Sequence, residues 1–85
     1  MALLMKANGI EETIHPQDGS EFSLEELQRL VGGYIERVPT PQSKDFIVNE
    51  EGILKGLPIN QKATMIAGQP IVGDMVILTG KERLT

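Results

Sequence analysis

Apolar and polar residues in this chain are arranged in short blocks, each about as long as one strand or one short helix. Residues 2–7 open with an apolar block, and residues 10–15 place two isoleucines among polar residues, with the period of two that is typical of a half-buried strand. The Asn-Gly dipeptide at 8–9 favours a tight hairpin turn between these blocks. Pro16 ends the second block, and residues 17–20 have the composition of a loop. The pattern therefore predicts a strand pair at the start of the chain.

The next block has helical spacing and the clearest end signals of the chain. Ser23 and Glu26 have the S-x-x-E spacing of a capping box, in which each side chain satisfies a free amide of the first turn. The leucines and valine that follow fall on one helical face, and the charged residues fall on the other. Gly32 or Gly33 supplies the left-handed residue that ends such a helix. We therefore predict a main helix over about residues 24–32.

The middle of the chain predicts three further strands. Residues 34–38 have strand composition and are closed by the loop 39–41, because its prolines restrict the backbone. Residues 45–49 form another strand-like block. Residues 50–52 are predicted to be a hairpin turn whose glycine has positive φ. Residues 53–55 would then return as the partner strand.

The last third of the chain predicts a second helix and a final strand. Asn60 can cap a short helix over residues 61–67. Residues 70–74 indicate a turn or a short strand, and residues 75–79 form an uninterrupted apolar block typical of a buried strand. Residues 81–85 are predicted to be a frayed tail.

Together these elements predict one α+β domain over residues 1–85. Its sheet would be mixed or antiparallel with about five or six strands, packed against a main helix at about 24–32 and a short second helix at about 61–67. The core must be aliphatic, because the chain has two Phe, one Tyr and no Trp. A small core of this kind and exposed strand edges predict a homodimer or a larger ring.

Composition and charge exclude several classes of protein. The chain has no Cys, which excludes disulfides and cysteine-based sites and is consistent with a cytoplasmic protein. The apolar start breaks at Lys6, so it does not predict a secretory signal, and no stretch approaches the roughly 20 apolar residues of a membrane span. The net charge is -4 and no basic stripe is present, so we expect no nucleic-acid partner and no membrane partner.

The sequence contains no recognisable catalytic set. His15 is the only histidine, and beside Pro16 at a strand end it is predicted to be a solvated surface residue rather than a general base. No Ser-His-Asp order and no H-E-x-x-H spacing is present. Catalytic zinc is therefore not expected. We expect no catalytic residue, no metal site and no cofactor.

Four motifs carry a resemblance to a known family. They are LVGGYIE at 30–36, VNEEG at 48–52, GLPIN at 56–60 and IVGD at 71–74. In this order they resemble a family of small proteins, a domain of unknown function, encoded mainly by bacteriophages and bacterial mobile elements. The resemblance covers roughly residues 27–78 and implies a phage or prophage setting, but it brings no agreed catalytic residue. One departure is the short loop between Gly68 and Ile71, so no ligand contact of a longer loop is carried over.

Polar residues at the glycine-rich corners of these motifs are the candidate ligand-binding residues. The two carboxylates within residues 49–52 can face a cation, and free amides near Asn60 can hold an anion or a polar ligand. An aromatic ring beside two glycines can stack on a base. The candidates are Tyr34, Glu36, Asn49, Glu50, Asn60 and Asp74. Purely structural roles stay open, with Asn60 as a helix cap and Asp74 in a turn.

The absence of a catalytic set, together with the resemblance, predicts a non-catalytic phage or prophage-encoded binding protein. One form of this hypothesis is a counter-defence protein that sequesters a small polar ligand or binds a host protein. The first alternative is a small hydrolase that uses Glu36, Glu50 or Asp74 as a general base. Two others are a self-associating structural or regulatory accessory protein and an acidic decoy whose binding to a host protein collapses with salt.

Overall fold

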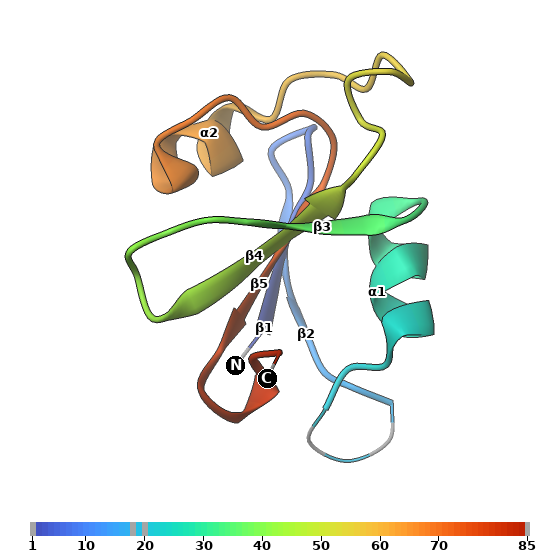
Figure 1. Ribbon diagram of the computed structural model, residues 1–85, viewed down its shortest axis with the longest axis vertical. Helices are drawn as coiled ribbons and strands as arrows, with labels where there is room; N and C mark the ends of the chain where they lie inside the picture. The colour runs from blue at the N-terminus through green and yellow to red at the C-terminus, as the bar shows by residue number, and fades with distance from the viewer. Residues whose placement is uncertain (1, 18, 20, 85) are drawn as a thin grey trace.

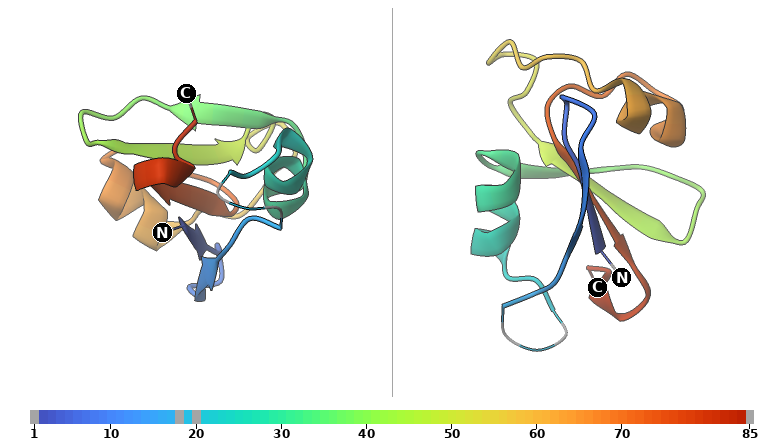
Figure 2. Two further views of the ribbon diagram at one scale, coloured as in Figure 1. Left: turned by 90° about the horizontal axis from the view of Figure 1, so that it is seen from below. Right: turned by 180° about the vertical axis from the view of Figure 1, so that it is seen from behind.

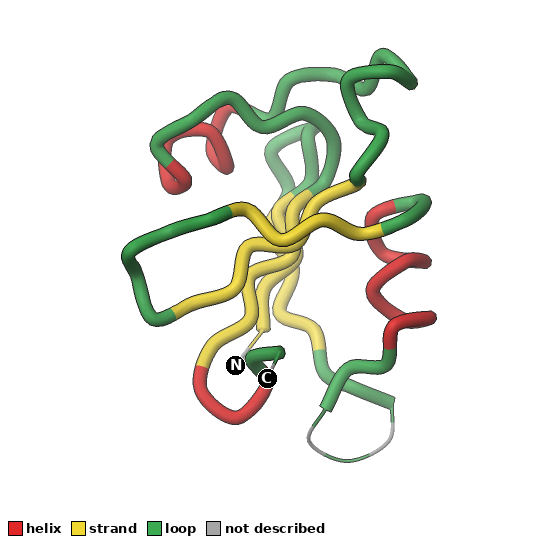
Figure 3. Tube along the Cα trace, in the orientation of Figure 1, coloured by secondary structure: helices red, strands yellow, loops and turns green. Residues whose placement is uncertain are grey.

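In the described residues, five short antiparallel strands, two α-helices and one 3-10 helix make up the fold, which is the predicted α+β class (Figure 1; Figure 3). The strands of this computed structural model are β1 (Ala2–Met5), β2 (Glu11–Ile14), β3 (Ile35–Val38), β4 (Lys44–Asn49) and β5 (Met75–Thr79). The helices are α1 (Leu24–Val31), α2 (Gln61–Ala67) and a short 3-10 helix at Gly80–Glu82. The strand order is β2-β1-β5-β4-β3, so the strand that comes last in the sequence is central in the sheet.

The structure describes residues 2–17, 19 and 21–84, without the side chain of Lys81. Asp18 and Ser20 of the predicted loop, Thr85 of the predicted tail and Met1 lie outside the described residues.

Both strands of the first hairpin are shorter than the blocks 2–7 and 10–15 that predict them. The turn is wider than the Asn-Gly dipeptide alone, because the Lys6 N–H donates to the Ile10 carbonyl at 2.8 Å. The Gly9 N–H donates in turn to the Lys6 carbonyl at 2.9 Å. Residues 6–10 are therefore all used by the turn.

Alternation along the strands divides the core into two layers, one on each face of the sheet. The layer beneath α1 contains Ala2, Leu4, Phe22, Leu27, Val31, Ile47, Val76 and Leu78. The layer beneath α2 contains Met5, Val38, Phe46, Val48, Ala63, Ile71, Met75 and Ile77. Figure 2 shows the two helices on opposite sides of the sheet. Because β5 is buried on both faces, its sequence is an uninterrupted apolar run rather than an alternating one.

The first turn of α1 is capped as the sequence predicts. The Ser23 Oγ accepts from the Glu26 N–H at 3.1 Å, and the Glu26 Oε1 accepts from the Ser23 N–H at 3.0 Å. The Glu26 Oε2 also accepts from the Gln17 N–H at 2.9 Å, so this carboxylate fixes the loop that enters the helix. Gly32, with φ of 81°, ends the helix at Val31, one residue earlier than predicted.

The long connection between β4 and β5 is tied to the sheet by one buried side chain, Asn60. Its Nδ2 donates to the carbonyls of Met5 and Gly73, both at 2.9 Å, and its Oδ1 accepts from the Ala63 N–H at 3.1 Å. Asn60 is 1% exposed, so these bonds satisfy an amide that water does not reach. The same residue therefore caps α2 and joins it to the end of β1.

The predicted strand at 53–55 is wrong, because the chain does not reverse into a hairpin after β4. Residues 50–56 form consecutive turns instead, which the Leu57 N–H closes by donating to the Gly52 carbonyl at 3.0 Å. The positive φ predicted for Gly52 is also wrong, since Gly56 adopts it, with φ of 67°. Gly52 is instead required for space, because a Cβ there would lie 2.9 Å from the Val72 side chain.

The prediction of a frayed tail is wrong for the described residues 81–84. The reason is the buried carboxylate of Asp45, whose Oδ2 accepts from the Leu84 N–H at 2.6 Å. Its Oδ1 accepts from the Arg83 guanidinium at 3.3 Å and from that of Arg37 at 3.5 Å. A buried carboxylate is costly unless it is paired, so Asp45 holds the end of the chain against the sheet.

We predict that Asn60→Ala lowers the free energy of unfolding by about 2–4 kcal/mol. The change removes a helix cap and leaves two buried carbonyl groups without their donor. Urea denaturation followed by circular dichroism measures the loss. The matched control is Asn8→Ala, which removes only an exposed turn bond to the Ile10 N–H and should cost less than about 1 kcal/mol. Equal losses in the two variants would contradict the anchoring role of Asn60.

The Glu26 carboxylate should contribute less to the stability of the fold at acidic pH. Hydrogen bonds from the backbone N–H groups of Ser23 and Gln17 lower the pKa of Glu26 below its ordinary value of 4.5. The folded state therefore favours the ionised carboxylate. Its contribution to stability is present above pH 4.5 and is lost as the pH falls through the lowered folded pKa.

Glu26→Gln should therefore be less stable than the parent at pH 7, and the difference should shrink as the pH falls below 4. Urea midpoints of both proteins between pH 7 and pH 3 provide the measurement. Glu25→Gln, at the exposed neighbouring position, is the control and should not reproduce this convergence. A stability difference that is independent of pH would show that the cap does not depend on the charge.

Candidate functional site

A pocket of about 210 Å³ lies where the β3–β4 hairpin meets the connection that leads from α2 to β5. It is open to solvent on one side. Its lining residues are Glu36, Val38, Pro39, Val48, Asn49, Glu50, Gly52, Ile53, Gln69, Pro70, Ile71 and Val72. Three of the six candidate residues predicted from the sequence therefore line the same pocket, which we call the acidic pocket.

Pairing between β3 and β4 brings the first wall together. Glu36 is opposite Val48 in the antiparallel register, so the two side chains lie on the same face of the sheet. Glu50 follows directly after β4, and its N–H donates to the Tyr34 carbonyl at 2.8 Å. This bond holds the start of β3 beside the end of β4 and thereby keeps both glutamates on one side of the pocket.

The opposite wall comes from residues 69–72, between α2 and β5. The Asn60 N–H donates to the Ile71 carbonyl at 2.8 Å, and the Gly73 N–H donates to the Pro58 carbonyl at 2.7 Å. Ile71 is buried and belongs to the core layer beneath α2. The wall is therefore fixed to the same buried network that anchors the helix.

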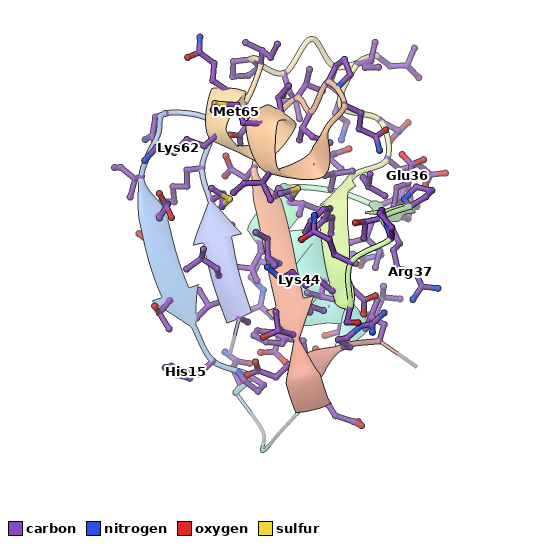
Figure 4. The ribbon with its side chains drawn as sticks, turned by 90° about the vertical axis from the view of Figure 1, so that its left-hand side faces the viewer. His15, Glu36, Arg37, Lys44, Lys62 and Met65 are labelled. Carbon is purple, nitrogen blue, oxygen red and sulfur yellow. The ribbon has the colours of Figure 1, made fainter. Side chains whose placement is uncertain are left out.

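The acidic pocket has an apolar floor and a charged rim. Val38, Val48 and Ile71 are buried in the core layer beneath α2, whereas Glu36 and Glu50 are exposed. Within the part of the chain that the structure describes, neither glutamate has an ion-pair partner. Figure 4 places Glu36 at the β3 edge of the sheet. Two unpaired carboxylates above aliphatic side chains suit a positively charged group carried on an apolar stem.

Asn49 supports the pocket from below. Its Nδ2 donates to the Val31 carbonyl at the end of α1 at 3.1 Å, and its Oδ1 accepts from the Glu51 N–H at 2.8 Å. The side chain is 5% exposed. Asn49 thus fixes the direction in which the chain leaves β4, and this direction places Glu50 at the rim.

The other three candidates, Tyr34, Asn60 and Asp74, do not line the acidic pocket. Asn60 is buried, and its side chain is used within the fold. The Asp74 Oδ1 accepts from the Ala7 N–H at 2.9 Å, which joins the first hairpin to the start of β5. Tyr34 is 64% exposed beside the acidic pocket, and only its carbonyl takes part in the contact described above. The structure therefore brings together Glu36, Asn49 and Glu50 but not Asn60 and Asp74.

Two features of the structure, one in the wall of the acidic pocket and one in the core, were not predicted from the sequence. The wall at residues 69–72 carries no charged group that would single it out, and its position depends on the crossover from β4 to β5. Asp45 did carry a signal, because a period of two places it on the same sheet face as Ile47, which is fully buried. A charged residue on a buried face predicts an ion pair.

The chain as a whole matches one family model. The match covers residues 2–85, and the family is described as Domain of unknown function (DUF3846). The chain belongs to this family. No curated protein and no solved structure matches the chain. In the described part of this DUF3846 domain, no helix has both the length and the apolar character needed to cross a membrane. Nor does that part contain a group of three His, Asp or Glu side chains suited to hold a metal ion.

We predict that Asn49→Ala destabilises the DUF3846 domain by about 1–3 kcal/mol, because it leaves a helix carbonyl and the Glu51 N–H without their buried partner. Thermal unfolding followed by circular dichroism measures this change. Gln69→Ala, which alters an exposed position in the other wall, is the control and should shift stability by less than about 0.5 kcal/mol. A neutral Asn49→Ala would mean that the turn after β4 forms without this side chain.

Proposed function

We propose that this domain is a non-catalytic binding protein whose acidic pocket takes a positively charged side chain of a host protein. The observation that carries the proposal is the pair of exposed carboxylates, Glu36 and Glu50, which have no ion-pair partner among the described residues and lie above an aliphatic floor. An Arg or Lys side chain matches both parts, because its stem is apolar and its end is a cation.

The size of the acidic pocket favours a side chain over a free metabolite. Pockets that enclose drug-sized ligands hold about 300–1,000 Å³. The acidic pocket holds about 210 Å³ and is open on one side. The small volume limits the affinity of a free ligand more than that of a protein partner. A protein inserts only one side chain and makes its other contacts outside the pocket. The net charge of -4 also favours encounter with a basic partner.

The proposal also includes where the protein acts and which genome encodes it. We place the protein in the cytoplasm of a bacterial host, encoded by a phage or prophage, where it counters a defence protein by binding it. The sequence motifs support this setting through the phage and mobile-element family that they resemble. Binding alone would suffice for this role, which agrees with a site built of carboxylates and apolar groups without a nucleophile beside them.

The hydrolase alternative has less support. A carboxylate that acts as a general base needs a nucleophile or a positioned water and, in most sites, a second proton carrier. The only histidine, His15, lies at the opposite edge of the sheet from Glu36 (Figure 4). The lining of the acidic pocket contains no Ser, Thr, Lys or His.

The test uses the tagged protein to capture host proteins from a bacterial lysate, with quantitative mass spectrometry of what is retained. We expect a host protein enriched by the parent and reduced at least about tenfold by Glu36→Gln combined with Glu50→Gln, because hydrogen bonds to charged groups contribute about 1.5–3 kcal/mol each. Capture should also weaken as salt rises from 0.1 M to 0.5 M.

The matched control is Glu21→Gln combined with Glu25→Gln, which removes the same charge from exposed positions near the start of α1. This variant should retain the captured protein. Equal capture by the pocket variant would overturn the proposal. Native mass spectrometry of the purified parent adds a second criterion, because an extra mass that is lost on unfolding would instead favour sequestration of a small polar ligand.

A further inference from the structure

The most exposed large apolar side chains of the described residues lie next to each other, at Ile53 and Leu54. Ile53 is 84% exposed and Leu54 is 86% exposed. They belong to residues 50–57, which project from one end of the molecule (Figure 1). Scattered exposed apolar residues are ordinary on protein surfaces, but two adjacent ones on a projecting turn form an apolar knob. We call these two residues the apolar tip.

The turns that carry the apolar tip are braced by the fold. The Lys55 N–H donates to the Glu51 carbonyl at 2.9 Å, and the Gly56 N–H donates to the Ile53 carbonyl at 3.1 Å. An ion pair of 3.9 Å joins Lys55 to Glu51, and the buried Gly52 packs against Val72. A tip that is ordered before binding has less conformational entropy to lose when a partner covers it.

The apolar tip and the acidic pocket form one continuous surface. Gly52 and Ile53 line the pocket, and Ile53 is also part of the apolar tip, so the two surfaces share this residue. Further apolar surface lies at the same end of the molecule, since α2 carries Met65, which is 83% exposed, and Ile59 before it is 55% exposed. Figure 4 shows Met65 on top of α2, at the end from which the turns project.

We propose that the apolar tip is the second half of the binding surface and docks into an apolar groove of the same partner protein, next to the basic residue that enters the acidic pocket. This inference rests on the proposed function and specifies its partner. The recognised surface is a Lys or Arg side chain flanked by an apolar groove. Because the tip projects and the pocket recedes, the partner must present the complementary pair, a groove beside a projecting cation.

The charges of the surface argue against two other occupants. A two-fold dimer built on this surface would bring Glu36 and Glu50 of both copies into one interface, and this concentration of acidic groups opposes it. An anionic membrane surface would meet the same repulsion from the acidic rim. A heterologous basic partner is the occupant that satisfies both the tip and the rim.

The experiment compares tip and pocket variants in the same capture from a bacterial lysate. We expect Leu54→Ser and the combination of Ile53→Ser with Leu54→Ser to reduce retention of the captured protein at least about tenfold, because a fully buried aliphatic side chain contributes that much to binding. The control is Leu24→Ser, at a 58% exposed position at the start of α1, which should retain it. Urea midpoints of the tip variants should equal that of the parent, because the changed side chains are exposed.

The outcomes separate this inference from the proposed function. Loss of capture with both the tip variants and the pocket variant supports the inference. Loss with the pocket variant alone overturns the inference and leaves the proposed function standing. Loss with the tip variants alone overturns both, because the tip would then act without the pocket. If neither the tip variants nor the pocket variant reduces capture, both the proposed function and the inference are overturned.

Two further measurements address the excluded occupants. Sedimentation of the parent that reveals a dimer abolished by Leu54→Ser would overturn the inference in favour of a second copy. Flotation with vesicles of phosphatidylethanolamine and phosphatidylglycerol, lost in the same variant, would overturn it in favour of a lipid surface. We expect the parent and Leu54→Ser to sediment with the same mass, and we expect neither protein to float with the vesicles.

Discussion

The amide of Asn60 joins the start of α2 to the end of β1 and to Gly73, just before β5. Two strands that neighbour each other in the sheet, β4 and β5, are separated by residues 50–74, and this long connection must return to the centre of the sheet. Asn60 fixes it there by bonding to the Met5 and Gly73 carbonyls while it caps α2. A buried amide that lacks partners is costly, so the connection has one favourable position. Both the wall of the acidic pocket and the layer of core beneath α2 follow from that position.

Local signals were sufficient for most elements, and they failed where a polar side chain has a distant partner. The capping box of α1 lies within four residues, and the strands show their period directly. The apolar dipeptide Ile53-Leu54 has the same composition as a strand. However, Asn49 donates to the distant Val31 carbonyl of α1 and accepts from the Glu51 N–H, and the chain turns instead. Similarly, the tail is ordered by Asp45, a residue that no local pattern near the tail reveals.

The sequence predicted residues 34–38 and 45–49 as strands and Glu36 and Glu50 as candidates, but it paired the second strand with residues 53–55. The structure pairs that strand with β3, and this register places both glutamates at one pocket. Asn60 and Asp74 lie elsewhere because their partners, the Met5 carbonyl and the Ala7 N–H, come from the first hairpin. The second wall at residues 69–72 depends on the crossover, and hydrophobic periodicity contains no information about where a crossover returns.

The polar and apolar groups of this small domain divide into those that the fold uses and those that it leaves open. Asn49, Asn60 and Asp45 are buried, and each satisfies backbone or charged groups from other elements. Glu36, Glu50 and the apolar tip are exposed, and within the described residues their side chains form no hydrogen bond or ion pair. Exposed aliphatic residues increase the tendency to associate. In the proposed function a basic partner with an apolar groove covers these groups together, which is the physical reason for proposing this end of the molecule as the binding face.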